Sequence, residues 1–271
     1  ASGLTIASRV ISGLSSIAAL SGVPLCRSPL TYGFLTVQED CFHGPTHRHH
    51  RRRRQHLFRF LAEPAGQPRG AVVVLQEIFG VNSHIRAVAD GYAAEGYLAL
   101  APATFDRVKS GVELGYTDAD MQAGFALKLA VEALPAPGVL ADIQAAIDEA
   151  ARRSGGKVGI VGYCWGGLLT WRSACELQGL AAAVPYYGGG MTTPDEAARR
   201  PKCPVLAHFA EQDHWIPMDT VEAFRAAQPS VELHSYDAHH GFNCDQRGAS
   251  HPPSAALARE RTLAFFARHL G

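Results

Sequence analysis

Three short segments contain residue types that together can perform nucleophilic catalysis. Cys164 lies in Gly-Tyr-Cys-Trp-Gly-Gly at 162–167, a Gly-x-nucleophile-x-Gly pattern in which the glycines permit a sharp turn into a helix. The start of a helix favours a thiolate, because the positive end of the helix dipole stabilises the anion. Taken alone, the segment also fits a small buried cysteine in a glycine-rich turn, so its partners decide the interpretation.

An acid and a base follow Cys164 in the sequence. Asp213 comes after an apolar run at 204–210, in a loop where its carboxylate can hold an imidazole in the required tautomer. The next such loop offers two histidines. We favour His240, because the glycine after it lets the loop bring the ring close to the nucleophile, and we expect His239 to be a bystander. The order nucleophile, acid, histidine is typical of the α/β hydrolases.

The segments that must position these residues alternate between strand and helix. Continuous apolar runs predict buried strands at 71–75, 97–101, 157–161, 180–187, 204–210 and 231–236. Helical patterns fall at 82–96, 119–133, 138–153, 166–178, 218–227 and 254–269. This alternation predicts one α/β domain over 57–271, a mostly parallel sheet with helices on both faces. Sites in such sheets lie at the carboxyl ends of the strands, where all three candidate residues fall.

Composition narrows the class of protein further. Of the 271 residues, 47% are hydrophobic, which excludes disorder for most of the chain. No apolar stretch approaches the ~18 residues that cross a membrane. Residues 57–271 hold 18 basic and 23 acidic residues, a net charge of −5, so they offer no basic surface for nucleic acid. We therefore expect a monomer that binds a small-molecule substrate, with no nucleic-acid or membrane partner.

The cysteines are too widely spaced to form a disulfide framework, and no Cys-x-x-Cys pair indicates zinc. They are Cys26, Cys41, Cys164, Cys175, Cys203 and Cys244. We expect free thiols in a reducing compartment, and hence a cytoplasmic protein without a metal site.

Residues 1–56 differ in composition from the rest, with seven basic residues, two acids and the run His-Arg-His-His-Arg-Arg-Arg-Arg at 47–54. Three interpretations compete: a targeting segment, a solvated basic tail, or a shifted reading frame. An Arg codon CGN followed by C reads GNC when shifted by one base, so 51–54 become Ala, Val, Asp or Gly. The shifted codons of 49–59 can encode two strands around an Asp-Gly turn. We hypothesise a frameshift that ends near Phe60.

The motifs together make residues 60–270 resemble the dienelactone hydrolase family, the carboxymethylenebutenolidases. The resemblance rests on Gln-Glu-Ile-Phe-Gly-Val-Asn at 76–82, the segment at 162–167, Asp213, and His-Gly-Phe at 240–242. It implies that Cys164, Asp213 and His240 form a triad and that Glu77 partners the cysteine. In this family, substrate binding displaces that glutamate, which then helps to generate the thiolate. Spacing alone would make Glu77 a solvated loop carboxylate.

The resemblance also implies binding groups for the substrate. The backbone N–H groups of Ile78 and Trp165 match the oxyanion hole of the family, and Arg107 matches an arginine that binds the substrate carboxylate. A second family arginine, four residues beyond the catalytic histidine, is here Cys244. We hypothesise that Arg247 replaces it from the next turn.

The activity implied is acyl transfer from a lactone or small ester to Cys164, followed by hydrolysis, without a metal or organic cofactor. For dienelactone the product is maleylacetate. One alternative is a carboxylesterase for other small esters or lactones, because one of the two family arginines is missing. The other is a ligand-binding or scaffold protein with an inert pocket, against which the complete Cys-His-Asp set argues.

Overall fold

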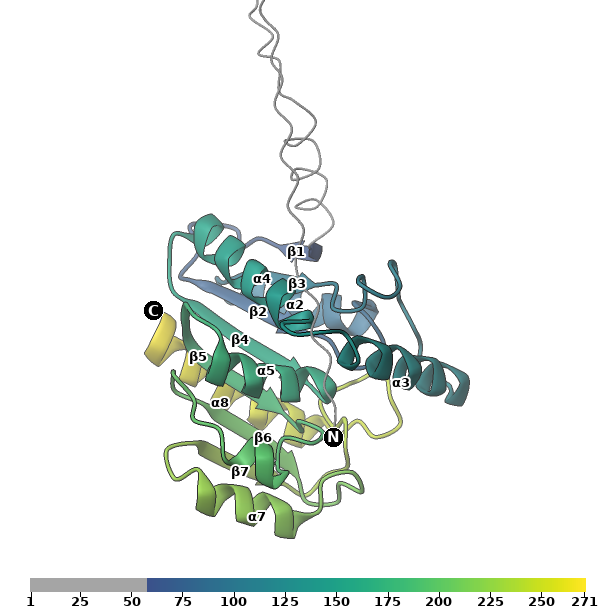
Figure 1. Ribbon diagram of the computed structural model, residues 1–271. Coiled ribbons are helices and arrows are strands. Elements are labelled where there is room, and N and C mark those ends of the chain that lie inside the picture. The colour runs from purple at the N-terminus through teal and green to yellow at the C-terminus, as the bar shows by residue number, and fades with distance from the viewer. Residues whose placement is uncertain (1–57) are drawn as a thin grey trace, which may run out of the picture. The chain divides into compact units, whose positions relative to one another are not determined.

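Figure 1 shows the computed structural model of the chain, which describes residues 58–271. The three interpretations of residues 1–56 concern a segment outside these residues and stay predictions. Among residues 58–271, no helix combines the length and the apolar character that a membrane span requires.

A seven-stranded sheet forms the centre of the domain, in the order β1-β3-β2-β4-β5-β6-β7 (Figure 1). Strands β2 to β7 run parallel, and β1 pairs antiparallel with β3 at one edge. Every residue of β2, β3, β4 and β6 is buried, as expected for parallel strands covered on both faces. The strands are β1 (Phe58–Ala62), β2 (Ala71–Leu75), β3 (Leu98–Pro102), β4 (Val158–Tyr163), β5 (Leu180–Tyr186), β6 (Leu206–Ala210) and β7 (Glu232–Tyr236).

Helices cover both faces of this sheet. Figure 1 shows α4 and α5 in front of the strands and α2 and α8 behind them. The helices are α2 (Ser83–Ala94), α3 (Asp118–Glu132), α4 (Val139–Ser154), α5 (Trp165–Glu176), α6 (Pro194–Ala197), α7 (Met218–Ala227) and α8 (Pro252–Leu270). Helix α3 differs from the others of its length, because its buried residues are only Gly124 and Val131.

Local sequence explains where several helices begin and end. The Asn82 side chain accepts a hydrogen bond from the Ile85 N–H at the start of α2 (3.3 Å). Helix α3 begins with a reciprocal capping box between Thr117 and Asp120. Helix α4 ends at Gly155, whose φ of 64° is left-handed and favours glycine.

The predicted fold class is confirmed, and each predicted strand and long helix forms with its ends shifted by a few residues at most. Two elements were not predicted. The edge strand β1 is short and half-buried, at Phe60 and Leu61, so it lacks the continuous apolar run of a central strand. The other is α6, which is too short to show helical periodicity.

Candidate active site

Cys164 lies at the sharp turn between β4 and α5. Its φ of 55° and ψ of −117° are rarely adopted by a residue with a side chain. The flanking glycines allow the turn to close: a Cβ on Gly162 would lie 2.2 Å from the Gly166 carbonyl oxygen, and one on Gly166 would lie 2.4 Å from that of Gln76. The turn therefore needs glycine at both positions, and it places the thiol at the N-terminus of α5.

Asp213 and His240 come together from the loops after β6 and β7. The His240 Nδ1 atom lies 2.6 Å from Asp213 Oδ2. The other carboxylate oxygen accepts hydrogen bonds from the backbone N–H groups of Trp215 (2.8 Å) and Ile216 (3.2 Å). Asp213 is buried and fixed from both sides, so it can orient the imidazole. By contrast, His239 is exposed, and its Nδ1 lies 3.1 Å from the Gln212 carbonyl oxygen.

The surroundings of His240 favour its charged form. Burial by itself lowers the pKa of the imidazole, but the charge of Cys164 and hydrogen bonds with Asp213 and Cys164 outweigh burial and raise the pKa to about 10. The folded chain thus favours the protonated form of the His240 imidazole, which lies within hydrogen-bond reach of both Asp213 and Cys164.

Cys164 and His240 line a cavity of about 270 Å³. Most of its other walls are apolar, and one wall comes from α3, which contributes Met121 and Phe125. Trp215 lies at the opening, 66% exposed, with its ring 5.9 Å from that of Phe125. The cavity therefore suits a small organic substrate with an apolar body.

Ile78 and Trp165 also line this cavity. Trp165 is the first residue of α5, so its backbone N–H has no partner within the helix. Both residues thus line the same cavity as Cys164, and their role as oxyanion donors stays a prediction.

Glu77 and Arg247 form a largely buried ion pair, and its arginine lines the same cavity as Cys164. The Arg247 Nη1 atom lies 3.2 Å from Glu77 Oε1, with side-chain exposures of 15% and 2%. The guanidinium also lies over the rings of Phe79 (5.4 Å) and Tyr116 (5.7 Å) and lines the cavity. Glu77 is therefore not the solvated carboxylate that spacing alone would predict, and Arg247 is within reach of a substrate.

Arg107 lies apart from this group. Its guanidinium forms an ion pair with Asp142 at the start of α4 (Nη2 to Oδ1, 2.9 Å), and Arg107 is not among the residues that line the cavity. The structure thus does not bring Arg107 together with Cys164 and Arg247.

Lys128 is a cavity residue that the sequence analysis did not identify. Its Nζ lies 2.7 Å from Glu132 Oε2, while Glu132 Oε1 accepts a hydrogen bond from the Trp165 indole (3.0 Å). Met121, Phe125 and Lys128 fall on one face of α3 at helical spacing, and this stripe is the signal that could have indicated a cavity wall.

A mostly parallel sheet with helices on both faces, a cysteine at a strand-to-helix turn, and an aspartate paired with a histidine after later strands form the arrangement of the α/β-hydrolase fold. An esterase from Pyrococcus furiosus shares this fold with a TM-score of 0.56 at 16% identity, over 75% of this chain and 85% of that one.

Comparison with known proteins also identifies the family within this fold. The model of the dienelactone hydrolase family matches residues 58–270. A carboxymethylenebutenolidase from Pseudomonas putida is 36% identical over 214 residues, which are 76% of this chain and 89% of the relative. A crystal structure from Klebsiella pneumoniae, assigned as a dienelactone hydrolase, is 36% identical with a TM-score of 0.67, over 76% of this chain and 91% of that one. The chain therefore belongs to the dienelactone hydrolase family, as its motifs predicted.

Proposed function

We propose that this hydrolase opens a lactone, or cleaves a small carboxylic ester, through Cys164 as nucleophile, with dienelactone to maleylacetate as the family reaction. The observation that carries the proposal is the environment of the largely buried His240. Its Nδ1 atom lies 2.6 Å from Asp213 Oδ2, and its contact with Cys164 helps to raise the pKa of the imidazole. The family and the name of the Pseudomonas putida relative support the lactone.

In the first half of the reaction, the Cys164 thiolate attacks the substrate carbonyl carbon. The tetrahedral oxyanion accepts hydrogen bonds from the N–H groups of Ile78 and Trp165, each worth about 3 kcal/mol of barrier. The carbonyl then re-forms, the ring C–O bond breaks, and His240 gives its proton to the leaving oxygen. The product of this half is a thioester on Cys164.

In the second half, neutral His240 takes a proton from a water molecule, whose oxygen attacks the thioester carbonyl. Collapse of the second tetrahedral intermediate breaks the C–S bond and restores the thiolate and the imidazolium. The acid leaves, and Asp213 holds the imidazole in one orientation through both halves.

Arg247 is the cation that we propose binds a substrate carboxylate. It lines the cavity and already holds the buried carboxylate of Glu77. A substrate carboxylate would compete with Glu77 for the same guanidinium and release Glu77 toward Cys164. The exposed ion pair of Arg107 with Asp142 supports this choice, and a role for Arg107 stays a prediction.

A carboxylesterase for neutral esters is the second candidate. The observation that favours it is the largely apolar cavity, in which Lys128 is already paired with Glu132. An apolar wall can bind an uncharged acyl or alcohol group without a carboxylate anchor.

The test compares hydrolysis of cis-dienelactone and of p-nitrophenyl acetate by the full chain, by Cys164→Ser and by Cys203→Ser. The last variant is the control, because Cys203 is a half-buried cysteine that does not line the cavity. We expect turnover of the lactone that Cys164→Ser loses and Cys203→Ser keeps. Turnover of the neutral ester alone would favour the carboxylesterase, and turnover of neither would leave a binding or scaffold protein.

We also propose that the protein acts as a monomer in the cytoplasm. Its four described cysteines are free, as expected in a reducing compartment. Size-exclusion chromatography with light scattering checks the monomer, and a dimer would contradict it.

A further inference from the structure

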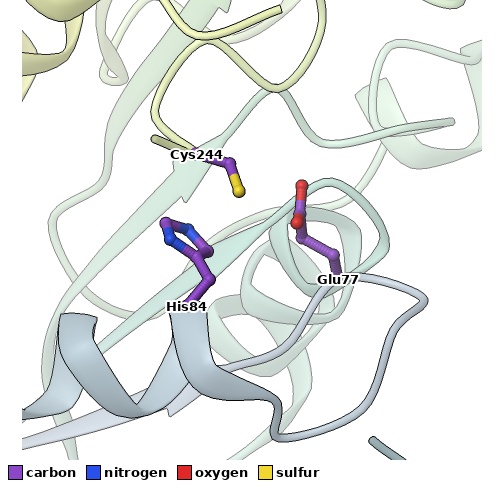
Figure 2. A group of neighbouring side chains, drawn as sticks. All are labelled: Glu77, His84 and Cys244. Atoms are coloured by element: carbon purple, nitrogen blue, oxygen red, sulfur yellow. The ribbon is translucent and has the colours of Figure 1, made fainter. Parts of the chain in front are cut away.

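A second group of reactive side chains lies behind the catalytic cavity. Figure 2 shows Glu77, His84 and Cys244 pointing toward one another from the loop after β2, from the first turn of α2, and from the loop after β7. All three residues are buried, and one ligand atom of each lies within 4.8 Å of the others. The proposed reaction uses Glu77 but neither His84 nor Cys244.

His84 has an unusual environment for a buried histidine. Its Nδ1 lies 3.4 Å from Asp245, whereas its Nε2 is buried without a hydrogen-bond partner among the described residues. An unpartnered buried nitrogen is costly, and in native structures such an atom requires an explanation, of which a bound water or ion is one. Lone-pair donation to a cation is one way to satisfy an imidazole nitrogen.

We infer that Glu77, His84 and Cys244 form a binding site for a thiophilic divalent cation such as Zn²⁺. A thiolate, an imidazole and a carboxylate are the three ligand types that Zn²⁺ accepts in proteins. Ligand atoms in a tetrahedral zinc site lie about 3.5 Å apart, so the observed group must close by roughly 1 Å. The absence of a Cys-x-x-Cys pair does not argue against this site, because its ligands come from distant segments.

Neighbouring groups can accommodate the ion. Arg247 donates a hydrogen bond to Glu77 Oε1, so the carboxylate can keep that contact and coordinate through its other oxygen. The Cys244 thiol donates a hydrogen bond to the Tyr116 hydroxyl (3.2 Å), which can donate back to a thiolate once the thiol proton has left. Outer contacts of this kind orient metal ligands.

An entry path is also present. A second cavity of about 270 Å³ is lined by His84, Asp245 and Asn243. The Asp245 side chain is 80% exposed and lies beside the His84 ring, so it can attract a cation to this opening. The ion therefore need not pass the catalytic cavity.

The test is Co²⁺ and Zn²⁺ binding to the full chain. Co²⁺ bound to a thiolate gives a sulfur-to-metal charge-transfer absorption. Histidines alone do not, which excludes a signal from the histidines that the sequence holds at 43, 47, 49, 50 and 56. We expect this absorption at one equivalent of Co²⁺, and its loss on addition of Zn²⁺. No turnover is measured, so the result is independent of the proposed function.

Three variants locate the ion. Cys244→Ser is expected to abolish the absorption and weaken binding by roughly 100-fold or more, because it removes the thiolate ligand. His84→Gln is expected to weaken binding while the thiol remains, and Cys203→Ser is the matched cysteine control. Circular dichroism verifies that each variant is folded.

Two results would overturn the inference. The first is no charge-transfer absorption in the wild type. The second is an absorption that survives Cys244→Ser, which would place the ion on another thiolate; its disappearance in Cys164→Ser would place it on Cys164.

Discussion

His240 and Asp213 lie in a largely buried group of side chains, where water screens their charges little. His240 gains its proton affinity from this group, and the gain exists only in the folded chain. A residue whose pKa is higher in the folded state than in the unfolded one stabilises the fold at low pH and loses that contribution as the pH rises.

We therefore predict a pH-dependent stability difference between the wild type and His240→Gln. The contribution of His240 is fully present below its ordinary pKa of 6.5 and is lost as the pH rises toward about 10. The excess Tm of the wild type should shrink by a few degrees over this range. Thermal unfolding followed by circular dichroism measures it, and a constant difference would contradict the predicted pKa shift.

Arg247→Ala tests the proposed carboxylate anchor. The KM for an anionic lactone should rise by about tenfold or more, because a partly desolvated charge contact is lost, whereas that for a neutral ester should change little. Arg152→Ala is the matched control and should leave both constants unchanged, since Arg152 pairs with Glu149 at the surface, away from the cavity. An unchanged KM for the lactone in Arg247→Ala would exclude it as the anchor.

At the scale of elements, the turn between β4 and α5 depends on the space that its glycines leave. Gly162→Ala would place a Cβ 2.2 Å from the Gly166 carbonyl oxygen, and we predict that it lowers the free energy of unfolding by about 3 kcal/mol or more. Gly248→Ala is the control, because a Cβ there has no neighbour within 4 Å. Urea unfolding measures both, and equal stabilities would show that the turn relaxes.

Helices α3 and α5 form two walls of the same cavity but differ in how they are anchored. Helix α5 buries ten of its 12 residues, whereas α3 buries Gly124 and Val131 among its 15. Sub-global opening is easiest where few apolar contacts hold an element. We predict that amide hydrogens of α3 exchange faster than those of α5, as measured by mass spectrometry; equal protection would contradict this.

At the scale of the whole molecule, the sequence predicts the sheet well and the binding groups less well. Central strands are recognisable because burial on both faces requires continuous apolar runs, and Cys164 is recognisable because its turn requires glycines. No comparable sequence pattern indicates which way a long side chain points. The expected role of Arg107 at the substrate therefore stays a prediction beside its ion pair with Asp142, and Lys128 was not noticed although it lines the cavity.

The reading-frame hypothesis for residues 1–56 also belongs to this scale. The family match begins at residue 58, close to the proposed end of the shift near Phe60. Resequencing the gene across codons 45–62 checks the hypothesis: a one-base difference is expected there, and an intact frame would rule it out.

The buried contact between Glu77 and Arg247 joins residues 170 positions apart in the chain. Contacts of such long sequence separation are expected to form late in folding, because a large loop must close before they can stabilise the chain. We expect Cys164 likewise to meet His240 late, because Asp213 and His240 follow β6 and β7 in the chain. Recovery of turnover after dilution from denaturant should therefore lag behind recovery of helical circular dichroism, which makes catalytic activity a reporter of the final stage of folding.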